Sequence, residues 1–366
     1  MAWSVRGVRP ATAKSLWFIT RKYPPVHGGM ELLSYELASR IAMRRPTRIV
    51  AMRGGRFALP AFLVVSACTL LLAAMRGSVA AVHLGDAVLA PLARIAKAFR
   101  VPTTVTLHGL DVTYAHPLYR LWLRMFLHGI DAYVCNSEAT RSAALQRGVA
   151  AARTSVIGIG VDLASIPPSR AAREDDLVLF VGRLVRRKGL AWLVEHVLPG
   201  VTQSRPALRL AVVGDGPERE AVSAAAVRAG VSERVRLLGT RGDAEKWDWY
   251  ARATLCVMPN VRVAGDMEGF GIVALEAMAA GCPLLAASID GVRDAVGNAP
   301  GVRLLAPGDA AAWSDALREL LADAALRDRG AAAAREWVAS ARSWERIVES
   351  YDDLFTALIA HARSAS

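Results

Sequence analysis

Short apolar runs alternate with longer, helix-like stretches along most of the chain. The first set of runs predicts strands, at residues 14–20, 48–52, 79–84, 102–107, 132–135 and 154–157. Between them lie stretches predicted to be helical, at residues 31–43, 57–75, 88–100 and 118–128. Strands that alternate with helices form parallel sheets, so this half predicts one α/β domain.

A second alternating set follows a stretch rich in glycine and proline at residues 158–169, which we interpret as a linker. Its predicted strands are residues 177–181, 208–213, 235–238, 255–259, 284–287 and 302–305. With 366 residues, the chain is too long for a single ordinary hydrophobic core. We therefore expect Rossmann-like domains at residues 1–165 and 166–342, and a C-terminal helix, residues 343–366, that packs back on the first domain.

Charge separates the two halves. Residues 1–170 hold 21 Lys and Arg against 7 Asp and Glu, a formal charge of +14, whereas residues 171–366 hold 24 against 26. A basic half favours an anionic partner. The arginines are scattered and no nucleic-acid-binding signature accompanies them, so we expect an anionic membrane surface and no nucleic acid.

The most apolar stretch, residues 57–75, carries no charge and is long enough to span a bilayer. Pro60, Ser66, Cys68 and Thr69 weaken that interpretation, and a strand pattern follows at once. We expect a buried or membrane-surface helix, with a partner interface and a true span as the alternatives.

The four cysteines are Cys68, Cys135, Cys256 and Cys282, which are far apart and form no C-x-x-C pair. This spacing indicates neither a disulfide framework nor a metal site and favours a reducing compartment. The N-terminal apolar run is too short for the core of a signal peptide. We expect a cytoplasmic protein, peripheral on the inner face of the cytoplasmic membrane.

Residues 265–283 hold the strongest candidate site. Glu268 precedes a Gly-Phe-Gly turn that opens a short apolar helix, and Glu276 is expected two turns into that helix. Unpaired N–H groups at the helix start favour a negatively charged ligand. The pattern predicts a binding site for a sugar nucleotide. The alternative is a helix with a solvated acid at each end.

Two further clusters follow predicted strands. Gly182, Arg183 and Lys188 lie on the loop after residues 177–181, where a guanidinium and an ammonium can hold a diphosphate together, unless this is only a solvated basic turn. In the first domain, Gly28 and Gly29 precede a helix and His108 follows the strand at 102–107. Ligands bind at the carboxyl ends of parallel strands, so these residues are candidates too.

Together these motifs resemble the retaining GT-B glycosyltransferases of family four, which include phosphatidylinositol mannosyltransferases and exopolysaccharide hexosyltransferases. The resemblance covers nearly the whole chain. It is most specific in Glu268-x7-Glu276 with Gly269-Phe270-Gly271 inside, and next in residues 180–184 with Lys188-Gly189. One departure is Gly158-Ile159-Gly160-Val161-Asp162 at the domain junction, where the family tends to carry Pro-Asn-Gly-Val-Asp.

The resemblance implies a role for each residue of the second domain. Arg183 and Lys188 neutralise the diphosphate leaving group, Glu276 binds the ribose, and Glu268 binds the transferred sugar. Gly182 and the backbone N–H groups of Phe270, Gly271 and Ile272 help to hold the donor.

In the first domain, the resemblance implies that the loop of Gly28 and Gly29 closes over the donor and that His108 contacts the sugar near the reacting face. The two domains then enclose a central cleft. His108, Arg183, Lys188 and Glu268 form the implied catalytic set.

The implied reaction moves a hexose of the mannose, glucose or N-acetylglucosamine type from a GDP-sugar or UDP-sugar to an acceptor sugar or glycolipid, with retention. The acceptor would be a lipid-linked or polysaccharide precursor at the membrane surface. The resemblance implies no metal and no other cofactor. A sugar-nucleotide epimerase on the same frame and a noncatalytic membrane-docked binder remain alternatives, and the missing dinucleotide fingerprint disfavours a dehydrogenase.

Overall fold

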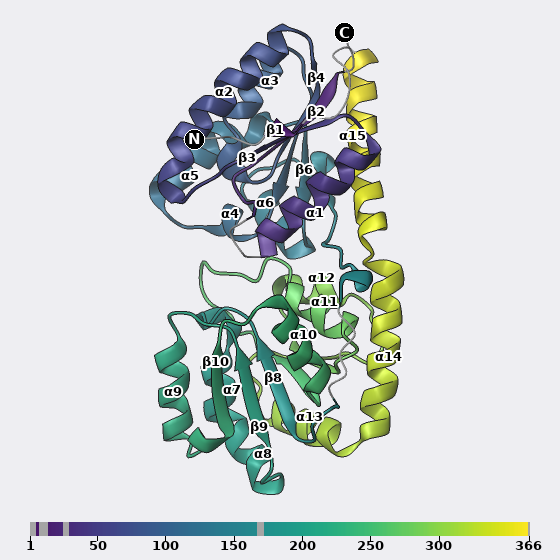
Figure 1. Ribbon diagram of the computed structural model, residues 1–366. Coiled ribbons are helices and arrows are strands. Elements are labelled where there is room, and N and C mark those ends of the chain that lie inside the picture. The colour runs from purple at the N-terminus through teal and green to yellow at the C-terminus, as the bar shows by residue number, and fades with distance from the viewer. Residues whose placement is uncertain (1–4, 7–13, 25–28, 167–171, 365–366) are drawn as a thin grey trace. The chain divides into compact units, whose positions relative to one another are not determined.

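The computed structural model describes residues 5–6, 14–24, 29–166 and 172–364. The chain divides into two compact units (Figure 1). The first unit comprises residues 1–160 and 344–366, and the second comprises residues 161–343. The sequence had suggested boundaries at 165 and 342.

A seven-stranded sheet forms the centre of the first unit, in the order β1-β3-β2-β4-β5-β6-β7. Six of its strands are parallel, and β1, which the sequence did not predict, pairs antiparallel with β3. The strands are β1 (Val5–Arg6), β2 (Ser15–Thr20), β3 (Thr47–Ala51), β4 (Val79–Leu84), β5 (Thr103–Leu107), β6 (Ala132–Cys135) and β7 (Thr154–Val156). Strand order reverses between β2 and β4, because the chain moves outward to β3 and then returns past β2.

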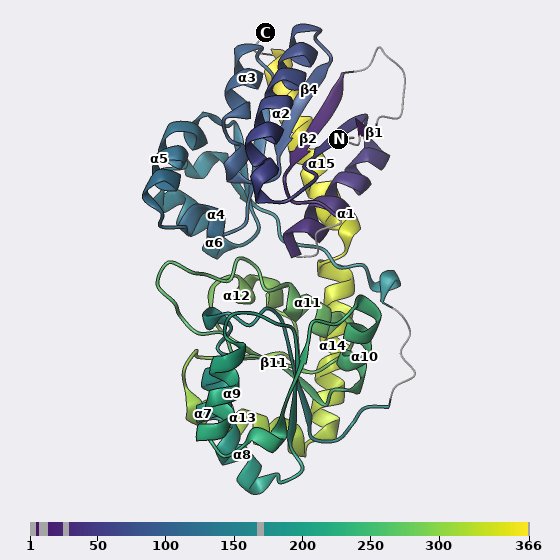
Figure 2. The ribbon, with the colours of Figure 1, turned by 60° about the vertical axis from the view of Figure 1, so that its left-hand side comes forward.

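Helices cover both faces of this sheet. They are α1 (Gly29–Arg44), α2 (Leu59–Met75), α3 (Leu92–Ala98), α4 (Leu110–Thr113), α5 (Pro117–Phe126), α6 (Glu138–Gln146) and α15 (Trp344–Ser364). Right-handed crossovers place α1 on one face and α2, α3 and α5 on the other, since their connections run in opposite directions along the sheet. Figure 2 shows α2 and α3 side by side, with α5 beyond them.

The C-terminal helix α15 packs back on the first unit, against α1 and β4, as the sequence predicted. Its buried Tyr351 places its hydroxyl 3.0 Å from Thr106 Oγ1 on β5. Asp352 accepts a hydrogen bond of 2.5 Å from Arg45 at the end of α1. These contacts join residues more than 240 positions apart into one core.

The second unit has a six-stranded parallel sheet in the order β10-β9-β8-β11-β12-β13. Its strands are β8 (Leu177–Val181), β9 (Arg209–Val213), β10 (Val235–Gly239), β11 (Leu255–Met258), β12 (Leu284–Ala287) and β13 (Arg303–Leu305). Its helices are α7 (Leu190–His196), α8 (Leu198–Ser204), α9 (Arg219–Arg228), α10 (Asp243–Arg252), α11 (Ile272–Ala279), α12 (Asp290–Val296), α13 (Ala310–Ala322) and α14 (Ala324–Ala341). The central strands β8, β11 and β12 are buried throughout, as expected for a parallel sheet covered on both faces. Here strand order reverses between β8 and β11.

The apolar stretch 57–75 contains helix α2, which is buried on one side only. Phe62, Leu70 and Ala74 enter the core, while Val64 and Leu72 are 63% and 46% exposed. No helix in the described part of the chain is both long and apolar enough to cross a membrane. Of the two forms expected for this helix, buried or at a membrane surface, the exposed outer side is compatible with the second, and also with a partner interface.

Candidate donor and acceptor sites

The carboxyl edge of the second sheet brings two distant loops together at the reversal of strand order. The loop after β8 carries Gly182, Arg183 and Lys188, and the loop after the neighbouring β11 carries Glu268. The backbone N–H of Val261 donates to Arg187 O across 2.9 Å, which joins the two loops directly. In open α/β sheets this position is the usual place for a ligand.

Gly189 makes the close approach of these loops possible. Its φ is +67°, and a Cβ at this position would lie only 1.9 Å from the carbonyl oxygen of Pro259. Because this oxygen is a backbone atom of the neighbouring loop, it cannot rotate away as the end of a side chain could. Glycine is therefore required for Lys188 to reach the β11 loop.

Glu268 is surrounded by donors from both loops. Lys188 Nζ lies 2.6 Å from Glu268 Oε2, and the buried Asn260 donates to the same oxygen through Nδ2 at 3.1 Å. Arg187 Nε lies 3.6 Å from that oxygen, and Arg187 Nη1 also bonds both oxygens of Asp266. The sequence predicted Lys188 and Glu268 as separate parts of one site, and the structure brings them into direct contact.

The ionisation of Glu268 follows from these neighbours. Burial by itself would raise the pKa of Glu268, but the charge and hydrogen bond of Lys188, followed by Arg187 and Asn260, outweigh burial and lower the pKa. The carboxylate is therefore ionised at neutral pH and is a weak base.

Glu276 is held separately, by helix α10. Lys246 Nζ lies 2.8 Å from its Oε1, and the Tyr250 hydroxyl donates to its Oε2 at 3.0 Å. Burial would lower the pKa of Lys246, but Glu276 and Asp243 outweigh burial and raise it. Since α11 begins at Ile272, Glu276 lies one turn into the helix, not two as expected.

The remaining candidates of the second unit lie around this pair. Gly182 has a φ of +143°, and Arg183 is exposed on the same loop as Lys188. Gly271, with a φ of +87°, precedes the first residue of α11, Ile272, and the side chain of Phe270 is buried. The first N–H groups of α11 have no partners within the helix.

His108 lies at the carboxyl edge of the first sheet, directly after β5. Its Nε2 is 2.8 Å from the carbonyl oxygen of Gly85, so in the neutral ring Nε2 carries the proton. Its Nδ1 is buried and has no hydrogen-bond partner among the described residues. That nitrogen is free to accept a hydrogen bond from a ligand.

A pocket of about 320 Å³ adjoins His108. Arg21 and Asp86, which follow β2 and β4 on either side of the reversal, form an ion pair of 2.7 Å in its wall. Asp111 Oδ1 accepts a 2.8 Å bond from the His108 backbone N–H, and burial raises the pKa of Asp111 above its ordinary value. The pocket thus combines two carboxyl groups, a guanidinium and a histidine at a ligand-binding edge.

The predicted glycine pair lies at the start of α1. Gly29 is the first residue of that helix, whereas Gly28 falls outside the described residues. Lys22 Nζ lies 3.0 Å from the buried carboxylate of Glu31 in the first turn of α1.

Several residues at these sites were not predicted as site residues from the sequence. They are Arg187, Lys246, Tyr250, Asn260 and Asp266 in the second unit, and Arg21, Asp86 and Tyr119 in the first. Arg187 could have been found, because it precedes Lys188 in the same basic turn. Lys246 and Tyr250 are one helical turn apart, but nothing in the sequence shows that this side of α10 faces Glu276.

The fold and both ligand-binding edges define a two-domain glycosyltransferase. Residues 175–323 match the family described as glycosyl transferases group 1, and residues 17–165 match glycosyltransferase family 4. The chain belongs to the family-four glycosyltransferases and has the GT-B fold, which confirms the resemblance seen in the sequence.

Individual relatives support this assignment. The chain is 34% identical over 283 residues to a GDP-mannose-dependent α-(1-6)-phosphatidylinositol monomannoside mannosyltransferase of Mycobacterium tuberculosis, covering 73% of this chain and 72% of the relative. It is 38% identical over 184 residues to a phosphatidyl-myo-inositol mannosyltransferase of Mycobacterium leprae, covering 50% and 47%. The sucrose-phosphate synthase of Thermosynechococcus elongatus shares the fold, with a TM-score of 0.74 at 22% identity over 95% of this chain and 100% of that one. The chain is therefore a glycosyltransferase that uses a nucleotide sugar.

Proposed function

We propose that the protein transfers mannose from a nucleoside-diphosphate sugar to a lipid-linked acceptor at a membrane surface, with retention of configuration. The observation that carries the proposal is the contact of Lys188 with Glu268 at the reversal point of the second sheet. Mannose and a phosphatidylinositol-type acceptor are favoured by the two mannosyltransferase relatives. Glucose and N-acetylglucosamine remain secondary candidates for the sugar.

The donor site would work by exchanging charge partners. Without donor, Lys188 neutralises Glu268; with donor bound, the Lys188 ammonium and the Arg183 guanidinium would stabilise the diphosphate as the glycosidic bond breaks. Glu268 would then accept hydrogen bonds from the sugar hydroxyls. The unpaired N–H groups at the start of α11 would add to the positive field.

Glu276 would bind the ribose hydroxyls. Each carboxylate oxygen has two lone-pair directions, and Lys246 and Tyr250 use one on each oxygen. The remaining directions would be available to a ligand. Lys246 and Tyr250 would fix the carboxylate in place and so lower the cost of binding.

Retention would proceed by attack on the same face that the leaving group occupies, with the leaving phosphate taking the acceptor's proton. In this route Glu268 accepts hydrogen bonds from the sugar hydroxyls and is not needed as a general base. In the first unit, His108 Nδ1 would contact the transferred sugar, and the pocket beside His108 would hold the acceptor.

We also propose that the reaction needs no metal ion, because Arg183, Lys188 and the helix start supply positive charge where the diphosphate would lie. Activity retained in EDTA would support this. Location at the inner face of the cytoplasmic membrane is supported by the charge of the first half and by the exposed apolar side of α2.

The test is transfer from GDP-mannose to phosphatidylinositol mannosides, followed by NMR of the product's anomeric configuration. Lys188→Ala should lower kcat by about 100-fold or more, the usual cost of removing a charge-stabilising group. Arg186→Ala is the matched control, since it removes the same charge from the same turn and should retain activity. Equal activity of wild type and Lys188→Ala would refute the assigned role.

The same assay separates the epimerase alternative. Incubation with donor and no acceptor should give only slow hydrolysis to free sugar. Accumulation of an epimerised sugar nucleotide would instead identify an epimerase.

A further inference from the structure

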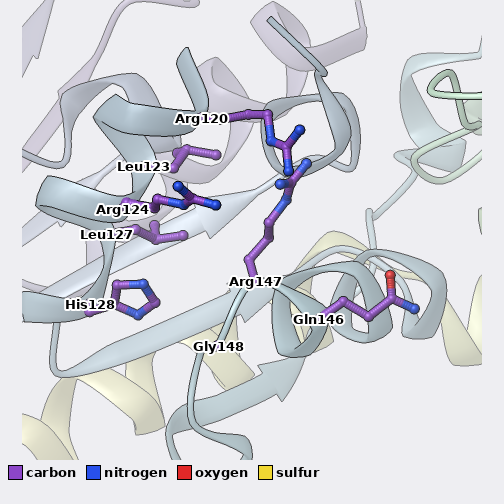
Figure 3. Close-up of a pocket in the computed structure, with 8 residues that line it drawn as sticks. All are labelled: Arg120, Leu123, Arg124, Leu127, His128, Gln146, Arg147 and Gly148. Atoms are coloured by element: carbon purple, nitrogen blue, oxygen red, sulfur yellow. The ribbon is translucent and has the colours of Figure 1, made fainter. Parts of the chain in front are cut away.

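A basic pocket outside both ligand-binding edges lies between α5 and the end of α6 in the first unit (Figure 3). Its volume is about 380 Å³, and its polar lining consists of Arg120, Arg124, His128, Gln146 and Arg147. No acidic side chain lines it. This pocket has no part in the donor or acceptor contacts described above.

The arginines are arranged for an anion. Figure 3 shows the guanidinium groups of Arg120 and Arg147 pointing toward one another, with Arg124 close by. Within the described ranges, none of the three arginines forms an ion pair with an acidic residue. Guanidinium groups that face one another repel. An anion bound between them therefore offsets this repulsion and also accepts hydrogen bonds from them.

One of these guanidinium groups is positioned in advance. Arg147 Nε donates to the carbonyl oxygen of Val112 at 2.9 Å, which leaves its two terminal nitrogens for a ligand. Arg120 and Arg124 are one turn apart on α5 and therefore project in similar directions. Three forked donors converging on one space suit a phosphate group better than a carboxylate, because phosphate offers more acceptor oxygens.

The surroundings of the pocket favour a lipid as the source of the phosphate. On α5, Leu118, Leu121 and Met125 are 72%, 53% and 50% exposed and lie on one side of the helix, next to Arg120 and Arg124. Helix α2, whose outer side is also apolar, covers the same face of the sheet. A free phosphate ion would make no contact with exposed leucine side chains, whereas the interface of a bilayer would bury them.

We propose that this pocket binds the headgroup phosphate of an anionic phospholipid while the exposed apolar side of α5 enters the bilayer interface. The proposal rests on the membrane association proposed above and adds a specific lipid contact to it. The pocket also adjoins the acceptor side: Val112 belongs to α4, whose Leu110 and Asp111 line the pocket beside His108. A lipid held here would keep that pocket at the level of the headgroups.

The test compares the double variant Arg120→Gln/Arg124→Gln with the control Arg76→Gln/Lys97→Gln. Both lose two positive charges; Arg76 and Lys97 are exposed and belong to the end of α2 and to α3 on the same face of the sheet. Binding would be measured by flotation with phosphatidylcholine vesicles that contain or lack phosphatidylinositol. We expect the pocket variant to bind the anionic vesicles about ten-fold more weakly than the control, because it also loses charge-assisted hydrogen bonds. Unchanged circular dichroism and unchanged binding of GDP would show that the variants are folded.

Equal vesicle affinity of the two variants would overturn the proposed role of the pocket in lipid binding, while leaving the proposed membrane association intact. No binding of wild type to anionic vesicles would overturn both membrane association and the pocket. Titration with inorganic phosphate and glycerophosphoinositol distinguishes the source: saturation of the pocket by inorganic phosphate, with vesicle binding unaffected, would overturn the lipid assignment. Because none of these readouts requires sugar transfer, a failure of the proposed enzymatic activity would be recognised separately.

Discussion

The two glutamates of the proposed donor site are held by different partners, which predicts that their roles can be separated. Glu268 contacts Lys188 and Asn260 on the loops at the sheet edge, whereas Glu276 contacts Lys246 and Tyr250 on α10. A substitution at one carboxylate therefore leaves the partners of the other in place.

We predict that Glu268→Gln lowers the transfer rate by about 100-fold while GDP still binds, because the lost charge acts on the transferred sugar. Glu276→Gln should instead weaken GDP binding by about ten-fold, since it removes the charged ribose acceptor and the closer of the two carboxylate partners of Lys246. Calorimetry with GDP and initial rates with GDP-mannose measure the two effects. Parallel loss of binding and rate in both variants would contradict the division.

At this scale the sequence predicted the charged residues but not their neighbours. Glu268, Glu276, Arg183 and Lys188 stand in a recognisable spacing. Asn260, by contrast, follows a buried strand with no motif around it, and the folding of the loop after β11 brings it to Glu268, while Lys188 comes from the loop after β8. Which groups meet across a sheet edge depends on strand order, and a linear spacing does not record strand order.

At the scale of elements, the apolar pattern of the sequence predicted the parallel strands well, because these strands are short, apolar and buried. β4, β6, β8 and β12 have the predicted bounds. Helices α6, α9 and α14 were not predicted; they contain many alanines and charged residues, so their apolar sides are narrow. Helix amphipathicity is a weak signal when alanine fills the buried positions.

Strand β4 carries a buried histidine that should make stability depend on pH. His83 Nδ1 lies 2.7 Å from Thr104 Oγ1, and burial, with a smaller contribution from the charge of His108, lowers the pKa of His83 to about 3. Between this value and the ordinary histidine pKa of 6.5, the unfolded chain binds the proton and the folded chain does not. The free energy of unfolding should therefore fall as pH is lowered through this window.

We expect this residue alone to contribute a slope of up to roughly 1.4 kcal/mol per pH unit. Urea unfolding of wild type and His83→Gln at several pH values between about 4 and 7 measures it, within the range where the ordinary histidine titrates. Carboxylates contribute equally to both proteins, so the variant should show a shallower slope. Identical slopes would mean that His83 does not carry this dependence.

At the scale of the whole molecule, the uneven charge predicts salt-sensitive membrane binding. Residues 1–170 carry a formal charge of +14, and the first unit also bears the exposed apolar sides of α2 and α5. Attraction to anionic lipid is screened over about 10 Å at 0.1 M salt and over about 3 Å at 1 M.

Binding to phosphatidylinositol-containing vesicles should therefore weaken steeply between these salt concentrations, with a smaller effect on neutral vesicles. Co-sedimentation over a salt series measures this. Affinity that depends on neither salt nor lipid charge would contradict electrostatic docking of the first half.

The sequence by itself determined the fold class and the family, and it predicted the charged residues of the proposed donor site, because these depend on local patterns of apolar runs, glycines and charges. Only the tertiary structure showed that Lys188 meets Glu268, that α10 holds Glu276, and that α2 is apolar toward solvent as well as toward the core. The basic pocket between α5 and α6 likewise appears only after folding, since Arg120 and Arg147 lie far apart along the chain. Local patterns specify elements, whereas the order and handedness of their connections decide which side chains share a site.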